Sequence, residues 1–389
     1  HEGDGDMSYS KAQIANLCTL VTSGGTPLTS VPAYYDPKEI PWLKTGEVNY
    51  CRIYDTESYI SKEGLARSSA KMIPANSVVV AMYGQGDTAG RVAINKIPLS
   101  TNQACCNLVI NHVIADYEYV YYALCTLYDR LVALKNGGAQ PNLNAKKIKA
   151  IEIPFPDLET QRTIASVLGA YDNLIENNQK QIKLLEEAAR RLYKEWFVDL
   201  RFPGYEDTPI VDGVPEGWER LPVGELIEKI PRTTQIMASE YGKEGPIPII
   251  DQSRGFIAGY TDNHASLVNV GKPVIVFGDH TRILKYIQFP FAKGADGTQL
   301  IVSNTDRMPQ SLFYCSLVGV DLSNYHYARH FKYLKAEELL VPTQVIAEAF
   351  DHFVSPMFSK IQRLRDINKA ATNARDRLLP KLMSGEIEV

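Results

Sequence analysis

The residues of this sequence with potential for chemistry do not form a recognisable catalytic set. Gly84–Gln85–Gly86–Asp87 has two glycines of a phosphate-binding loop, but it does not continue as G-x-G-x-x-G, and a turn is the simpler interpretation. The seven His residues are scattered, and the sequence contains neither G-x-x-x-x-G-K-[ST] nor G-x-S-x-G nor H-E-x-x-H. Acidic pairs such as Glu186–Glu187 are typical of a solvated helix face. The sequence therefore predicts no active site and no metal site.

Length and composition set further limits. The chain has 389 residues, 45% hydrophobic and 22% charged, which fits about two to three globular domains and excludes a disordered chain or a disulfide miniprotein. No apolar run approaches the ~18 residues of a membrane span. Six cysteines without a C-x-x-C pair favour a reducing cytoplasm, with no zinc site or disulfide framework. Residues 1–7 carry no signal pattern, and we interpret them as an expression remnant before a native Met7.

Two long amphipathic patterns predict helices over residues 158–200 and 343–389. Apolar residues alternate at spacings of four and three over more than four heptads, which is typical of a coiled coil. The expected pairing residues are Ile164, Leu168, Tyr171, Ile175, Ile182, Leu185 and Leu192, then Ile346, Phe350, Phe353, Met357, Leu364, Ile367 and Leu378. One polar residue interrupts each series, Asn178 in the first and Lys360 in the second. The alternative is burial in two separate cores, although core helices of roughly 40 residues are rare.

The ends of these helices carry expected capping signals. Asp157 and Thr343 are expected N-caps, because each places a side-chain oxygen before the first turn. Gly385 is the expected stop of the second helix, and Phe202–Pro203–Gly204 the end of the first.

The segments that precede the helices also match in pairs. Val79–Gly84 resembles Val274–Asp279, Asn102–Val109 resembles Gly297–Val302, and Ile14–Leu17 resembles Val223–Leu226. Pro and Gly turns mark residues 201–217 as a linker. We therefore predict a duplicated unit of mixed α/β (α+β) class. A globule over residues 8–157 is followed by its helix, and a linker and second globule over residues 201–342 are followed by theirs.

Three blocks of the sequence resemble the DNA-specificity subunit of type I restriction–modification systems. The first is Ser23–Pro27 with Ile40–Glu47, the second Gln140–Asn144 with Ile151–Pro156 and Gln161–Ala165, and the third Arg377–Ile387. The second globule departs from this pattern, because it has no G-G-T-P and carries Tyr325–His330 in place of Q-P-N-L.

The resemblance implies two target-recognition domains, residues 8–157 and 201–342 with the linker. A central helix (158–200) and a distal helix (343–389), both conserved in the family, would pack antiparallel and act as a ruler. Asn178 would then lie beside Lys360 where the middles of the helices meet. Each domain would read one half of an asymmetric double-stranded DNA site. The chain itself would be non-catalytic and hold no cofactor. Two docked modification subunits would carry S-adenosylmethionine and methylate adenine, and the resemblance leaves open whether a restriction subunit joins them.

Side-chain chemistry then suggests which residues contact DNA bases. Arg suits guanine, and Asn or Gln suits adenine, in two-point major-groove contacts. The candidates are Ser23, Gly24, Gly25, Thr26, Lys44, Gln85, Asn102 and Gln103 in the first domain and Gln252, Arg254, His280, Arg282, Lys285 and Gln299 in the second. The alternative for each is an exposed polar loop residue. Because the net charge is −4 and the pI near 6.0, we expect partner subunits to supply part of the phosphate contact.

Two other functions stay open. The chain could be a non-catalytic coiled-coil scaffold whose globules bind protein or glycan. It could also be a fragment of a methyltransferase, but Ile153–Pro154–Phe155–Pro156 lacks the Asn of the N-P-P-F motif of adenine methyltransferases. Salt-dependent DNA binding would separate the scaffold from the DNA reader, and binding of S-adenosylmethionine would reveal the fragment.

Overall fold

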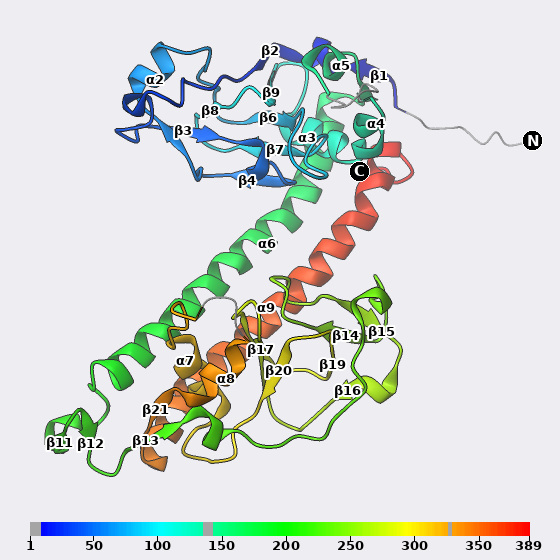
Figure 1. The fold of residues 1–389 in the computed structure, drawn as a ribbon. Helices are drawn as coiled ribbons and strands as arrows, with labels where there is room; N and C mark the ends of the chain where they lie inside the picture. Colours follow the sequence, from blue (N-terminus) through cyan, green and yellow to red (C-terminus); the bar gives the residue numbers. More distant parts are fainter. Residues whose placement is uncertain (1–8, 135–142, 326–328) are drawn as a thin grey trace, which may run out of the picture. The chain divides into compact units, whose positions relative to one another are not determined.

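The computed structural model describes residues 9–134, 143–325 and 329–389, so the predicted remnant at residues 1–7 and part of Q-P-N-L lie outside the described residues. The chain divides into two compact units. Unit 1 extends to Ile175 and includes Lys369–Val389, and unit 2 covers Glu176–Asn368. Two long helices, α6 (Leu158–Tyr193) and α9 (Gln344–Ser384), each contribute to both units (Figure 1).

Unit 1 is built on two sheets. The larger has the strand order β2-β9-β6-β7-β4, with β2 at Cys18–Ser23, β9 at Cys105–Ile110, β6 at Ser77–Ala81, β7 at Val92–Asn95 and β4 at Cys51–Ile53. The smaller has the order β5-β3-β8, with β5 at Tyr59–Ile60, β3 at Ile40–Leu43 and β8 at Ser100–Thr101. Strand β1 (Lys11–Gln13) pairs with β10 (Glu152–Pro154) directly before α6. The short helices are α1 (Ile14–Leu17), α2 (Lys62–Ala66), α3 (Tyr117–Cys125), α4 (Tyr128–Ala133) and α5 (Ala145–Lys149).

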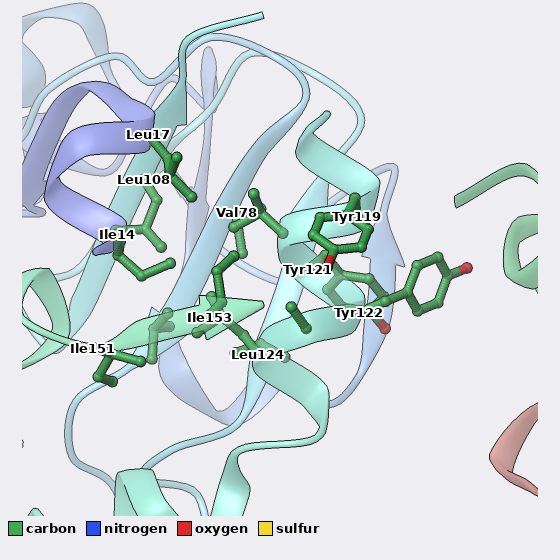
Figure 2. Packing of buried hydrophobic residues seen from close by; sticks show 14 of the residues in the cluster. Ile14, Leu17, Val78, Leu108, Tyr119, Tyr121, Tyr122, Leu124, Ile151 and Ile153 are labelled. Carbon is green, nitrogen blue, oxygen red and sulfur yellow. The ribbon is translucent and has the colours of Figure 1, made fainter. Parts of the chain in front are cut away.

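The core of unit 1 lies between the larger sheet and α3. All five residues of β6 are buried, as expected for a central strand covered on both faces. Asp116 caps α3 by accepting a hydrogen bond from the Tyr119 N–H at 3.0 Å. In Figure 2, Tyr119 of this helix lies beside Val78 and Leu124 beside Ile153 of β10, within one buried cluster. The core also includes Leu382 and Met383, from the last turn of α9.

Unit 2 repeats this topology. Strand β17 (Val274–Gly278) lies between β20 (Thr298–Ile301) and β18 (Leu284–Ile287), as β6 lies between β9 and β7. Strand β14 (Ile247–Ile250) is antiparallel to β15 (Gly259–Thr261) and parallel to β19 (Phe291–Lys293), as β3 is to β5 and β8. Strand β13 (Glu219–Pro222) pairs with β21 (Glu338–Val341) before α9. The other elements are β11 (Ile210–Val211), β12 (Val214–Pro215), β16 (Leu267–Val268), α7 (Gln310–Val318) and α8 (His330–Ala336). The predicted mixed α/β duplication is confirmed.

The capping signals act mostly as expected. Asp157 accepts hydrogen bonds from the N–H groups of Glu159 and Thr160, both at 3.0 Å. Gly385 follows α9 with φ +80°, a left-handed conformation that favours glycine. Helix α9 begins immediately after Thr343, whose carbonyl accepts from Ala347 N–H at 3.0 Å. The α-helical part of α6 ends at Tyr193, and a π-helical turn over Lys194–Val198 continues it toward the predicted end.

The pairing face of α6 agrees with the heptad pattern, but that of α9 requires a correction. Ile164 and Leu168 are buried, whereas Phe353 and Ile367 are 52% and 45% exposed. The predicted Phe350 and Leu364 are buried, and the buried stripe of α9 also includes Ala347, Val354, Phe358, Ile361 and Ala371. The expectation that Asn178 meets Lys360 is wrong, because Lys360 is exposed and Asn178 Nδ2 donates to Asn368 Oδ1 at 2.8 Å. Two apolar stripes lie side by side along α9. The heptad spacing assigned Phe353 and Ile367 to the pairing stripe, but they belong to the more exposed stripe.

The Asn178–Asn368 contact gives a testable prediction. Asn178→Leu removes one amide of a mostly buried pair, so we expect it to destabilise the protein by about 1 kcal/mol. The double variant Asn178→Leu, Asn368→Leu replaces both amides with apolar groups. Its free energy of unfolding should equal or exceed that of wild type, because a polar pair in a helix interface lowers stability while it fixes the register of the helices. Urea unfolding measures the free energy of unfolding of the single and the double variant. A double variant less stable than the single one would contradict this role.

Candidate nucleic-acid interface

The structure brings most of the first domain's candidate residues together at one edge of its sheets. Ser23 ends β2, Lys44 follows β3, and Asn102 and Gln103 join β8 to β9. Backbone hydrogen bonds connect these segments: Gly25 N–H donates to Thr101 O at 2.9 Å and Asn102 N–H to Leu43 O at 2.9 Å. The Thr26 hydroxyl donates to Gln103 Oε1. Three segments distant in sequence therefore form one polar edge.

The two glycines of G-G-T-P, Gly24 and Gly25, hold this edge together. The prediction that they contact DNA bases is wrong. Both are buried, and their N–H groups donate within the domain, that of Gly24 to Cys105 O at 3.2 Å. A Cβ on Gly24 would lie 2.2 Å from Asn102 O, and one on Gly25 2.2 Å from Ala70 N. Glycine is required here because the loop packs directly on neighbouring backbone.

Lys44 and Gln85 remain available for contact with a ligand. Lys44 is exposed, and its Nζ lies 5.3 Å from the centre of the Trp42 ring, a cation–π geometry that orients the long side chain. Gln85 is exposed in the loop after β6. Met82 N–H donates to Ala104 O at 2.8 Å, so this loop begins beside the Gln103 loop.

The second domain places Gln252 and His280 at the equivalent edge. Gln252 Nε2 donates to Asp296 O at 2.8 Å, and His280 N–H donates to Gln252 Oε1 at 3.0 Å. Both ends of this amide therefore connect neighbouring loops. Arg254 is exposed, and Arg282, at φ +60°, is also exposed while its Nη1 donates to Leu322 O at 3.1 Å. Gln299 lies on β20, opposite Phe277.

The prediction that Lys285 contacts a DNA base is also wrong. Its side chain is buried, and Nζ donates to Asp251 O at 2.7 Å and to Gly255 O at 2.5 Å. Burial lowers the pKa of Lys285, although the nearby Asp251 opposes this. Lys285 therefore fixes the loop that carries Gln252 and Arg254.

Sequence analysis missed two cations of the second domain. Ile236 N–H donates to Lys293 O at 3.1 Å, the same connection that Gly25 makes to Thr101 in unit 1. Burial, and to a smaller extent the positive charge of Arg232, lowers the pKa of Lys293. The signal in the sequence was weak, because the parallel pairing of β14 with β19 that brings residue 293 to this edge leaves no local motif. Within the described ranges, no group of three or more His, Cys, Asp or Glu side chains could hold a metal ion.

The glycines allow a matched test of this edge. Gly25→Ala should destabilise unit 1 by roughly 1–3 kcal/mol, as expected for overpacking, because the new methyl meets backbone. Gly46→Ala, whose Cβ has no atom within 4 Å, should leave thermal unfolding nearly unchanged. Equal unfolding temperatures for the two variants would show that the loop is not packed as described.

Comparison with known proteins places this edge in context. Residues 8–187 match the family model described as type I restriction modification DNA specificity domain. The chain is 27% identical to the type I restriction enzyme MjaIX specificity subunit of Methanocaldococcus jannaschii, over 95% of this chain and 91% of that protein. It is 28% identical to the EcoR124I/EcoR124II specificity subunit of Escherichia coli, over 46% of this chain and 45% of that protein.

A solved structure supports the fold. The S subunit of a type I restriction–modification system from M. genitalium superposes with a TM-score of 0.64 at 17% identity, over 98% of each chain. No helix in the described ranges is long and apolar enough to cross a membrane. Residues 8–187 therefore match the type I restriction modification DNA specificity domain, and the chain is similar over most of its length to specificity subunits of these systems.

Proposed function

We propose that each unit of this specificity subunit binds one half of a split, asymmetric DNA site through the edge described above. The observation that carries the proposal is the repeated topology with different side chains at equivalent places. Unit 1 presents Thr26, Lys44 and Gln103, whereas unit 2 presents Arg254 and, at the end of β19, Lys293. Unlike donor and acceptor sets select unlike bases, so the two half-sites should differ in sequence.

The proposal assigns chemistry and part of the affinity to partners. The chain is non-catalytic, and two modification subunits supply S-adenosylmethionine, methyl transfer to adenine and part of the phosphate contacts, since this chain has a net charge of −4. The exposed apolar residues Leu184, Phe353 and Ile367 of the long helices support docking there. The lengths of α6 and α9 would set the spacer, which is the number of base pairs between the two half-sites. The six cysteines, which form no disulfide in the described part of the chain, support a reducing, cytoplasmic setting, and a restriction subunit is a further candidate partner.

Binding to duplex DNA as a function of salt tests the proposal. With modification subunits present, the logarithm of the binding constant should fall linearly with the logarithm of salt concentration, because phosphate contacts release counterions. Binding that is indifferent to salt, or directed to protein or glycan, would favour the scaffold alternative.

Loop exchange gives a sharper prediction. Replacing Ser23–Lys44 by the corresponding segment of a relative should change the bases recognised in one half-site only, because contacts made by separate units are nearly additive. The measurement is selection of bound sequences from random DNA by wild type and chimera. A change in both half-sites would contradict independent reading.

A further inference from the structure

A chain of charged and polar contacts joins the globular part of unit 1 to both long helices. Arg52 of β4 donates through Nη1 to Asn173 Oδ1 of α6 at 2.5 Å, and its Nη2 lies 3.4 Å from Glu118 Oε1 of α3. Tyr122, also of α3, donates from its hydroxyl to Asp172 Oδ2 of α6 at 2.5 Å. The other oxygen of Asp172 accepts from Arg375 Nη1 of α9 at 2.5 Å. The contacts thus run from the sheet through α3 and α6 to α9.

These contacts lie in a largely dry environment. The Arg52 side chain is 5% exposed and that of Asp172 11%. Burial, followed by the negative charge of Asp172, raises the pKa of Tyr122, so its hydroxyl keeps the proton that it donates. Charged hydrogen bonds with little access to water are directional, and losing one partner leaves the other poorly solvated. This group of residues should therefore fix an orientation as well as hold surfaces together.

Gly169 indicates that α6 is shaped to receive the arginine. It is buried inside a helix, where glycine is less favourable than alanine by about 1 kcal/mol. A Cβ at this position would lie 3.2 Å from Arg52 Nη2 and 3.5 Å from Glu118 Oε2. The missing side chain lets the guanidinium approach the helix closely, and the next turn supplies Asp172 and Asn173.

Unit 2 attaches its globule to the helices with aromatic contacts beside polar ones, such as the hydrogen bond that Ser311 Oγ of α7 donates to Asp351 Oδ1 of α9 at 2.6 Å. Tyr286 of β18, Tyr314 of α7 and Phe358 of α9 form an aromatic trio with ring centres 4.7 to 5.4 Å apart. The neighbouring Gln288 donates from Nε2 to Phe358 O at 2.8 Å. After β7, at the matching position of unit 1, Lys96 donates to Glu118 Oε1 at 2.9 Å. Aromatic contacts tolerate small rotations, whereas the hydrogen-bonded ions of unit 1 do not.

We propose that the angle of the first DNA-reading globule on α6 and α9 is set by four positioning residues, Arg52, Tyr122, Asp172 and Arg375. Gly169 leaves the space in which Arg52 lies against α6. This inference rests on the proposed function. The angle determines which spacer length lets the first half-site meet its edge in register. The network therefore contributes to spacer specificity without touching DNA.

Spacer competition with the assembled complex of this chain and its modification subunits tests the proposal. The probes are duplexes that carry the two selected half-sites at the preferred spacer and at spacers one base pair shorter or longer. Asp172→Asn keeps the shape but removes the charge that Arg375 and Tyr122 contact. It should reduce discrimination between spacers about tenfold while base preferences within each half-site stay the same. Gly169→Ala should act in the same direction by displacing Arg52.

Matched variants separate positioning from folding. Glu187→Gln removes a charge from an exposed pair with Arg191 on the same helix and should leave spacer discrimination unchanged. Arg375→Lys should restore part of the discrimination that Arg375→Met loses. If Asp172→Asn does not fold, the milder Tyr122→Phe and Asn173→Ala carry the test. Unchanged discrimination in folded variants would overturn the positioning role alone. Failure of the wild-type complex to bind any selected duplex would overturn the proposed function, and this inference with it.

Discussion

The side-by-side packing of α6 and α9 is the constraint on which the rest of the structure depends. Neither unit has a complete core without both helices. In unit 1, Leu382 and Met383 of α9 join a core that also holds Ile164 and Leu168 of α6. In unit 2, Phe350 and Phe358 of α9 meet Ala189 of α6 and Trp196 of the turn that follows it. Because residues from the end of the chain complete the first unit, folding of the two units is coupled through the helices, and substitutions in one helix should be felt in both.

The strand pairs β1–β10 and β13–β21 explain how the globules can vary while the frame stays the same. Each pair brings the start of a globule next to its last strand, directly before a long helix. Everything between these strands can change in length without moving the helix start. The loops at the candidate interface use this freedom. G-G-T-P packs on backbone in unit 1, where Thr101 ends its strand, whereas Lys293 holds the matching strand position in unit 2.

The sequence allowed prediction of features whose signals are local. Asp157 and Gly385 act as expected because capping depends on one or two residues. The duplication was predictable because three pairs of segments keep their order. The buried stripe of α9 was not, because two apolar stripes lie side by side and heptad spacing does not distinguish the exposed Phe353 from the buried Val354. Burial of Lys285 also escaped prediction, since its partners are carbonyl groups of a distant loop. Lys293 comes to this edge through the parallel pairing of β14 with β19, which leaves no local motif in the sequence.

In the proposed function, one duplicated frame brings two different DNA-contacting edges to one DNA molecule. Selection of bound duplexes from a random pool by the complex of this chain with its modification subunit, followed by sequencing, tests this. We expect two short, unlike motifs at a fixed separation, with no base preference between them. A single continuous motif, or two copies of the same motif, would contradict it.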